Sequence, residues 1–154
     1  MGIKLWLTEQ AGPLPETALI LQATVPTGAD ALSSGQLQPQ LSWLYGWDVI
    51  PDRLTLAGST LGFRDRDDGG HDFVTLAQSV TLGYGLTERF GAYTEWYALF
   101  PTSAVEPGLG PQHFFNGGFT YLVGPNFQLD IRAGLGLNRR ADDFFTGTGF
   151  VVRY

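Results

Sequence analysis

The chain has 154 residues, of which 16% are charged and 14% aromatic, and its formal net charge is −6. An average soluble domain carries about 25% charged residues, and phosphate backbones are bound by clustered lysines and arginines, so this composition argues against a water-exposed surface and a nucleic-acid partner. The absence of cysteine excludes a disulfide-stapled fold, thiolate metal sites and cysteine nucleophiles.

Apolar and polar residues alternate with a period of two in blocks of about ten residues, which is typical of β-strands. The expected strands, in chain order, are residues 2–8, 17–25, 37–47, 53–63, 72–84, 90–100, 112–123, 127–137 and 144–154. No apolar run approaches the roughly 20 residues that a transmembrane helix needs. The pattern therefore predicts a single all-β domain over residues 1–154.

The clearest block, residues 127–137, separates into two faces as only an extended strand can. Its apolar face contains Phe127, Leu129, Ile131, Ala133, Leu135 and Leu137. Its opposite face contains Gln128, Asp130, Arg132, Gly134 and Gly136. In residues 72–84 the apolar face has one polar exception, Gln78, and the faces of residues 53–63 are both mixed.

The connections alternate in length, which favours an antiparallel up-and-down barrel over a Greek-key sandwich. Short connections are expected at residues 11–16, 48–52, 85–89 and 124–126, and longer or charged ones at 26–36, 64–71, 101–111 and 138–143. We expect a transmembrane β-barrel of about 8–10 strands in this chain, or part of a larger barrel of about 12, because bacterial single-chain barrels have even strand numbers. The first residues do not form a signal peptide, so we expect a signal and one or more strands to precede them.

Two observations indicate that the apolar faces meet lipid. The polar faces consist mainly of Gly, Ser, Thr, Gln and Asn, whereas a soluble barrel is usually rich in Lys and Glu outside. Aromatic residues stand beside the short turns, as an interfacial girdle requires: Tyr45, Trp47, Tyr84, Phe90, Tyr121, Phe127 and Tyr154. The predicted lipid-facing residues include Leu129, Ile131, Leu135, Phe150, Val152 and Tyr154. The alternative is a soluble lipocalin-like barrel that binds a hydrophobic ligand.

The last residues, 149–154, read Gly-Phe-Val-Val-Arg-Tyr. They resemble the C-terminal signal of outer-membrane proteins, which has a glycine, an apolar residue three positions later and a terminal aromatic. The usual polar residue two positions before the glycine is replaced by Gly147. The resemblance implies that the barrel-insertion machinery is a partner of this strand.

The C-terminal third carries a more specific likeness, in residues 128–132 (QLDIR), 134–138 (GLGLN) and 142–149 (DDFFTGTG). These segments resemble the end of the outer-membrane family named for a meta-pathway of phenol degradation. Residues 85–89 (GLTER) with Glu95, and residues 26–28 (PTG), are similar to that family as well. The resemblance implies a transporter-like barrel in the bacterial outer membrane that passes small hydrophobic or aromatic compounds.

No motif for catalysis or for a cofactor stands out. The only imidazoles are His71 and His113, and without cysteine they cannot build a histidine-rich metal site. The acidic residues 65–72 lack the spacing of an EF-hand, and they are interpreted as a solvated external loop. We therefore expect no catalytic residues, metal or cofactor, and not an enzyme.

Charged and amide side chains within the strands are the candidate functional residues. In a barrel they point into the lumen, where unpaired charges are costly, so a paired network is expected. Hairpin geometry predicts that Asn116 lies across from Glu95, and that Asp130 or Gln128 lies opposite Arg153. The network either fills and staples the lumen or forms a substrate-selective constriction. The pore-lining candidates are Glu95, Asn116, Gln128, Asp130, Arg132 and Arg153.

Three functions remain open at this point. The first is an outer-membrane barrel that passes or binds small solutes, with the lipid bilayer and lipopolysaccharide as its surroundings. The second is the soluble lipocalin-like barrel. The third is a membrane barrel that does not transport and serves a structural or adhesive role through its longer loops.

Overall fold

The computed structural model describes residues 1–26, 37–66, 69–102 and 109–153, and the regular elements of these residues are all β-strands. The strands are β1 (Gly2–Thr8), β2 (Glu16–Thr24), β3 (Gln38–Ile50), β4 (Leu54–Arg66), β5 (Asp72–Gly85), β6 (Phe90–Thr102), β7 (Gln112–Gly124), β8 (Phe127–Gly136) and β9 (Phe144–Val152). Each corresponds to a block of alternating residues in the sequence, so the nine predicted strands are confirmed.

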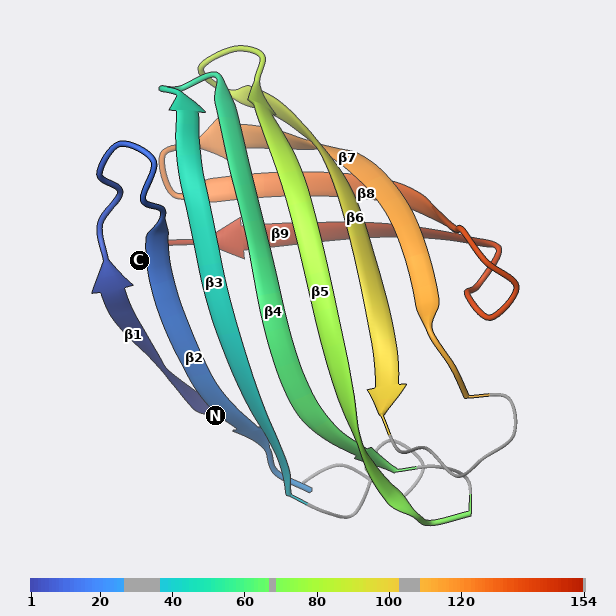
Figure 1. Ribbon diagram of the computed structural model, residues 1–154. Helices are drawn as coiled ribbons and strands as arrows, with labels where there is room; N and C mark the ends of the chain where they lie inside the picture. The colour runs from blue at the N-terminus through green and yellow to red at the C-terminus, as the bar shows by residue number, and fades with distance from the viewer. Residues whose placement is uncertain (27–36, 67–68, 103–108, 154) are drawn as a thin grey trace.

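Each strand pairs antiparallel with the next one along the chain, and together they form one sheet in the order β1 to β9. The sheet is strongly curved, so that β7, β8 and β9 pass behind β2 to β6 (Figure 1). Within the described residues, no strand pairs with the free edge of β1 or of β9. The predicted up-and-down topology is therefore confirmed, and the barrel is open between its first and last strands.

The two faces of the curved sheet can be told apart by contacts between strands that are not neighbours. The rings of Tyr97 on β6 and Phe145 on β9 lie 6.3 Å apart although β7 and β8 run between them. Side chains converge in this way only on the concave side. We call this side the inner face and the opposite side the outer face, and the pairing register assigns every strand residue to one of them.

The outer face is covered by exposed apolar side chains. Leu21, Leu41, Ile131 and Phe150 keep 58%, 49%, 55% and 70% of their surface exposed. On the inner face, in contrast, several small or polar residues of the described strands are buried: Ala18, Ser42, Thr75, Ala77 and Asn116. The sheet therefore turns its apolar side outward, which is the reverse of a barrel with an oily core.

Aromatic residues gather on the outer face near the short turns. The register places on this face the described members of the predicted girdle, namely Tyr45, Trp47, Tyr84, Phe90, Tyr121 and Phe127. Phe90 stacks on Phe119 with ring centres 5.5 Å apart, and Phe127 lies 6.1 Å from Phe150. The remaining predicted member, Tyr154, lies outside the described residues.

The β3–β4 turn explains why β3 continues three residues beyond the end that the sequence indicated. The chain reverses at Pro51–Asp52–Arg53, with Asp52 in the left-handed region at φ 61°. Aspartate tolerates this conformation better than most residues. The pairing consequently continues to Ile50 and Leu54, with an irregularity between Asp48 and Ile50. The mixed pattern of β4 is also resolved, because its Ser59 pairs with Ser79 on the inner face.

Candidate functional site

The inner face of β5, β6 and β7 carries a hydrogen-bonded carboxylate at mid-height. Glu95 on β6 lies beside Thr81 on β5 and Asn116 on β7, because the three residues occupy one row of the register. Thr81 Oγ1 donates to Glu95 Oε1 at 3.1 Å, and Asn116 Nδ2 donates to Glu95 Oε2 at 2.9 Å. The predicted position of Asn116 across from Glu95 is confirmed. The carboxylate is thus held by two neutral donors.

Asn116 is the most deeply placed side chain of this group, with 1% of its surface exposed. Its Oδ1 atom is buried and accepts no hydrogen bond from the described residues. Leaving such an acceptor unpaired costs about 1–3 kcal/mol, so this cost offsets part of the stability that the hydrogen bond from Asn116 to Glu95 contributes. The backbone register, rather than the amide alone, keeps Asn116 at this position.

Aromatic rings line the inner face next to this carboxylate. Tyr97 stacks on Phe114 with ring centres 4.6 Å apart, and Phe145 meets both rings edge-on at 6.3 and 6.0 Å. The Phe145 ring lies over Gly134, where a Cβ atom would overlap the ring. Glycine at position 134 therefore makes room for an aromatic wall that spans β6, β7 and β9.

Arg132 and Asp130 extend from β8 across the glycines of β9. A Cβ atom at Gly147 would lie 3.0 Å from Arg132 Nε, and one at Gly149 would lie 2.7 Å from Asp130 Oδ2. The Arg132 guanidinium lies 5.9 Å from the centre of the Phe145 ring, within the range of a cation–π interaction. The two glycines are thus the surface on which both charged side chains rest.

The paired network expected on the inner face is seen at Glu95 and Asn116, but in the described residues it does not extend to ion pairs of Asp130 or Arg132. In residues 1–26, 37–66, 69–102 and 109–153, the ion pairs within 4 Å join Arg64 and Arg66 to Asp72, and none of them involves an inner-face charge. The reason is the register: Glu95 shares its row with Asn116, whereas Arg132 shares its row with Gly118 and Gly147. The charges are instead held by neutral hydrogen-bond donors, glycines and an aromatic ring.

The predicted partner of Arg153 is wrong. Gln128 pairs with Val151 and Asp130 pairs with Gly149, so neither lies opposite Arg153. Arg153 follows β9, and its backbone N–H donates to Asn126 O at 3.0 Å at the short β7–β8 turn. The β8–β9 connection shifts the pairing by two residues relative to the expectation, which keeps each side chain on its face but changes its neighbour.

The candidate residues of the sequence nevertheless sort onto two faces. The register places on the inner face Glu95, Asn116, Gln128, Asp130 and Arg132. It places on the outer face Leu129, Ile131, Leu135, Phe150 and Val152. Their roles in lining a pore or meeting lipid stay predictions. Tyr154 lies outside the described residues.

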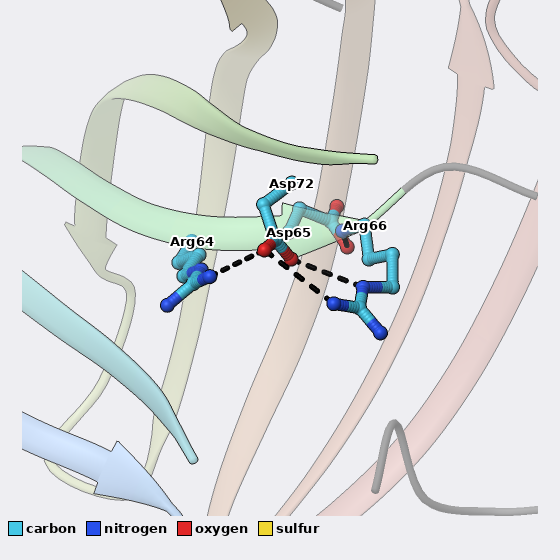
Figure 2. A network of polar contacts seen from close by, with 4 residues as sticks. All are labelled: Arg64, Asp65, Arg66 and Asp72. Carbon is cyan, nitrogen blue, oxygen red and sulfur yellow. Dashed lines mark hydrogen bonds and ion pairs between the residues drawn. The ribbon is translucent and has the colours of Figure 1, made fainter. Parts of the chain in front are cut away.

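A second polar cluster lies on the outer face at the loop end of β4 and β5. Arg64 and Arg66 both bind the carboxylate of Asp72 (Figure 2). Arg66 Nε donates to Asp72 Oδ1 at 3.0 Å, and Arg64 Nη2 donates to Asp72 Oδ2. Hydrogen bonds from Arg66 and then Arg64 lower the pKa of the exposed Asp72 carboxyl, which stands at the loop end of its strand. In the predicted acidic loop, Asp67 and Asp68 lie outside the described residues.

A third cluster was not predicted. On the outer face, Thr60 Oγ1 donates to Gln78 Oε1 at 2.7 Å, and Gln78 Nε2 donates to the hydroxyl of Tyr45. The Tyr45 ring lies over Gly58, where a Cβ atom would be 2.5 Å from ring atom Cε2. The signal in the sequence was Gln78 itself, the polar exception on an apolar face.

The full chain, residues 1–154, matches the sequence profile of a family described as "Putative MetA-pathway of phenol degradation". The chain belongs to this family. The match extends the resemblance seen in the C-terminal hairpin to every strand of the sheet, including β1. A search of curated proteins finds no match.

Two further observations complete the description of this family member. Among the described residues, no three His, Cys, Asp or Glu side chains are grouped so that they could hold a metal ion. The same residues include no helix with the length and apolar character to cross a membrane.

Proposed function

We propose that this chain forms the wall of a bacterial outer-membrane β-barrel that passes or binds small hydrophobic or aromatic solutes on its inner face. The observation that carries the proposal is the exposure of the apolar outer face, where Ile131 and Phe150 keep 55% and 70% of their surface exposed. Contiguous apolar surface of this extent marks a membrane or protein partner. A lipocalin-like barrel would instead pack these side chains inside.

The aromatic residues support the same location. Phe90, Tyr121 and Phe127 stand on the outer face beside successive short turns. Tyr and other aromatic rings are favoured at the headgroup layer, where the apolar body of the ring meets hydrocarbon and its edge meets water. The short-turn end of the sheet would accordingly lie at one interface of the bilayer, with the longer connections at the other.

Closure of the barrel would require further strands. β1 and β9 run in the same direction because each of the nine strands is antiparallel to the next. Antiparallel closure between these edges therefore takes an odd number of additional strands, which makes the total even, as in bacterial single-chain barrels. Three such strands give about 12, the size of barrel expected from the sequence. In hydrocarbon neither edge can stay unpaired, since each unsatisfied backbone group costs several kcal/mol.

The inner face supplies contacts suited to an aromatic solute. Tyr97, Phe114 and Phe145 present ring surfaces, and the Glu95 carboxylate next to them can accept a hydrogen bond from a hydroxyl group. These are the two contacts that a phenolic compound offers. The proposed role is passage or binding, and we assign the chain no catalytic step.

The location is tested by expressing the protein in bacteria and separating membranes from soluble material. Recovery in the outer-membrane fraction, with dependence on detergent for solubility, is the expected result. A monodisperse protein in plain buffer would instead favour the soluble lipocalin-like barrel, and it would overturn the proposal.

The passage of solutes is tested by reconstitution into liposomes and planar bilayers. We expect uptake of phenol, and we expect Glu95→Ala to change its rate while Thr148→Ala, which lies on the outer face opposite Ile131, leaves it unaltered. Absence of both uptake and conductance in correctly inserted protein would favour a structural role. Insertion is checked separately by protection of the outer face from protease.

A further inference from the structure

A groove crosses the outer face near the loop ends of β2 to β5. It has a volume of about 540 Å³ and is lined chiefly by Leu21, Pro39, Leu41, Gly62, Arg64 and Val74. Its walls are mainly apolar. Gly62 has no side chain to fill the groove, and a Cβ atom there would meet Leu76 Cδ2 at 3.4 Å as its nearest neighbour. The groove is therefore a shallow, largely apolar depression of the surface, with the Arg64 guanidinium and the Asp72 carboxylate at one end.

The charged end of this groove is the cluster drawn in Figure 2, in which two guanidinium groups share one carboxylate. Arg64 keeps 49% of its side chain exposed, Arg66 37% and Asp72 32%. Arg64 is thus the more exposed of the two arginines and the one that lines the groove. Asp65 belongs to the inner face by register, although its Oδ1 atom accepts the backbone N–H of Arg66 at 2.9 Å.

The height of Arg64 on the sheet matches a second bilayer interface. On β4, eight residues separate Arg64 from Leu56, which pairs with Trp47 in the aromatic belt at the short-turn end. At about 3.3 Å per residue this is about 26 Å along the strand, and the strand tilt reduces it to about 20 Å along the bilayer normal. The apolar band of an outer-membrane barrel is about 25 Å tall, so the Arg64 backbone lies about 5 Å short of the opposite interface, a distance that its long side chain can span to reach the headgroups.

We propose that this groove binds a phosphorylated lipid of the surrounding leaflet, with an acyl chain along Leu21, Leu41 and Val74 and its phosphate on Arg64. Guanidinium groups bind phosphate oxygens through paired N–H donors, and the Arg64 guanidinium, with 49% of its side chain exposed, lines the end of the groove. Asp72 competes with the phosphate for the same donors. The inference rests on the proposed membrane location and adds a specific lipid partner to it.

The test uses the protein purified from membranes in detergent, with diphosphorylated lipid A and its dephosphorylated form, which has the same acyl chains, as probes. Native mass spectrometry measures the lipid retained. Arg64→Gln is expected to reduce retention of the phosphorylated lipid about tenfold, as loss of a charge-assisted contact would. Asp72→Asn is expected to increase retention, because it removes the competing carboxylate. Arg53→Gln, at the short-turn end of β4, is the matched control and should leave retention unchanged.

A second variant tests the apolar part of the groove. Gly62→Leu places a side chain in the groove while leaving the arginines intact, and it should lower retention of both lipid forms. Equal retention by Arg64→Gln and Arg53→Gln would overturn the proposal. So would displacement of the lipid by inorganic phosphate alone, which would assign the cluster to a free anion, or burial of the groove in a dimer of the purified protein.

Failure of this proposal can be told apart from failure of the membrane location. A protein that is recovered in the outer membrane and retains lipid equally in all variants contradicts only the lipid site. A protein that is soluble without detergent contradicts both.

Discussion

Asn116 donates a hydrogen bond from its side-chain amide to Glu95 across the β6–β7 pair, with 2.9 Å between Nδ2 and Oε2, and only 1% of the Asn116 surface is exposed. Hydrogen bonds to charged groups contribute about 1.5–3 kcal/mol to stability. We expect Asn116→Ala to lower the free energy of unfolding by less than this amount, because the change also removes the buried Oδ1 atom that accepts no hydrogen bond from the described residues. The measurement is urea titration of protein in lipid vesicles with tryptophan fluorescence.

A double-mutant cycle with Glu95→Ala isolates the pair, because the two side chains are in direct contact and alanine removes the acceptor. The control is Gln128→Ala, which removes an amide from the inner face and should cost little. Additive effects of Asn116→Ala and Glu95→Ala would contradict a coupling between these two residues.

Gly58 and Gly62 offer a matched comparison on the outer face of β4. A Cβ atom at Gly58 would lie 2.5 Å from Tyr45 Cε2 and 2.7 Å from Ser79 O, whereas at Gly62 its nearest neighbour would be 3.4 Å away. Gly58→Ala should therefore displace the Tyr45 ring and destabilise the protein by about 1–3 kcal/mol, the usual cost of overpacking. Gly62→Ala should stay within about 0.5 kcal/mol.

Near-ultraviolet circular dichroism reports the displaced ring directly. We expect the aromatic signal of Gly58→Ala to change, since Tyr45 also touches Trp43 and Trp47 with ring centres 5.0 and 6.1 Å away. Similar spectra and stabilities for the two alanine variants would show that the ring can move without loss.

Asp72 gives the outer cluster a dependence on pH. Its pKa is lowered by the hydrogen bonds from Arg66 and Arg64 relative to the ordinary value of 3.8. A lowered pKa contributes stability above the unfolded-state value, and this contribution is lost as the pH falls through the folded-state pKa. Wild type and Asp72→Asn should accordingly differ at neutral pH and converge as the pH falls below 3.8.

The measurement is unfolding at a series of pH values, at low and at high salt. Because the cluster is exposed, salt should reduce the difference between the two proteins. Asp143→Asn, which changes another exposed carboxylate, serves as the control. A difference between wild type and Asp72→Asn that does not change with pH would mean that packing, rather than charge, stabilises this end of the hairpin.

The alternation of residues predicted the strands and the face of each side chain, but not which residues meet across strands. A side chain is assigned to a face by the period of two alone, so Leu129 and Asp130 separate without any knowledge of the fold. A shift of two residues preserves the faces, and the sequence therefore could not tell whether Gln128 pairs with Val151 or lies opposite Arg153. That choice is made by the conformation of the β8–β9 connection.

Ion pairs and aromatic contacts depend on this register, and the sequence therefore predicted them less accurately than it predicted the strands. The pairing of Glu95 with Asn116 was predicted correctly because β6 and β7 are long strands that pair in one register without an irregularity. Contacts across more than one strand, such as that of Tyr97 with Phe145, depend on the curvature of the sheet. Curvature has no signature in the alternation of residues.

The direction of the outer face is best tested by placing arginine at neighbouring positions of β8. Leu129 and Ile131 lie on the outer face, and Gln128 lies on the inner face beside Leu129. Arginine on the lipid face costs about 2–4 kcal/mol at the bilayer midplane and falls to about 0–1 kcal/mol near the interfaces. Ile131 is further from the short β7–β8 turn than Leu129, so Ile131→Arg should cost more than Leu129→Arg.

Gln128→Arg is the matched control, because it adds the same charge one residue away on the inner face, where water can solvate it. Unfolding from lipid vesicles should therefore rank the three variants as Ile131→Arg, then Leu129→Arg, then Gln128→Arg, from most to least destabilised. Equal tolerance at positions 128 and 129 would mean that both sides of β8 meet water. The exposed apolar side chains of the outer face would then require a protein partner instead of lipid.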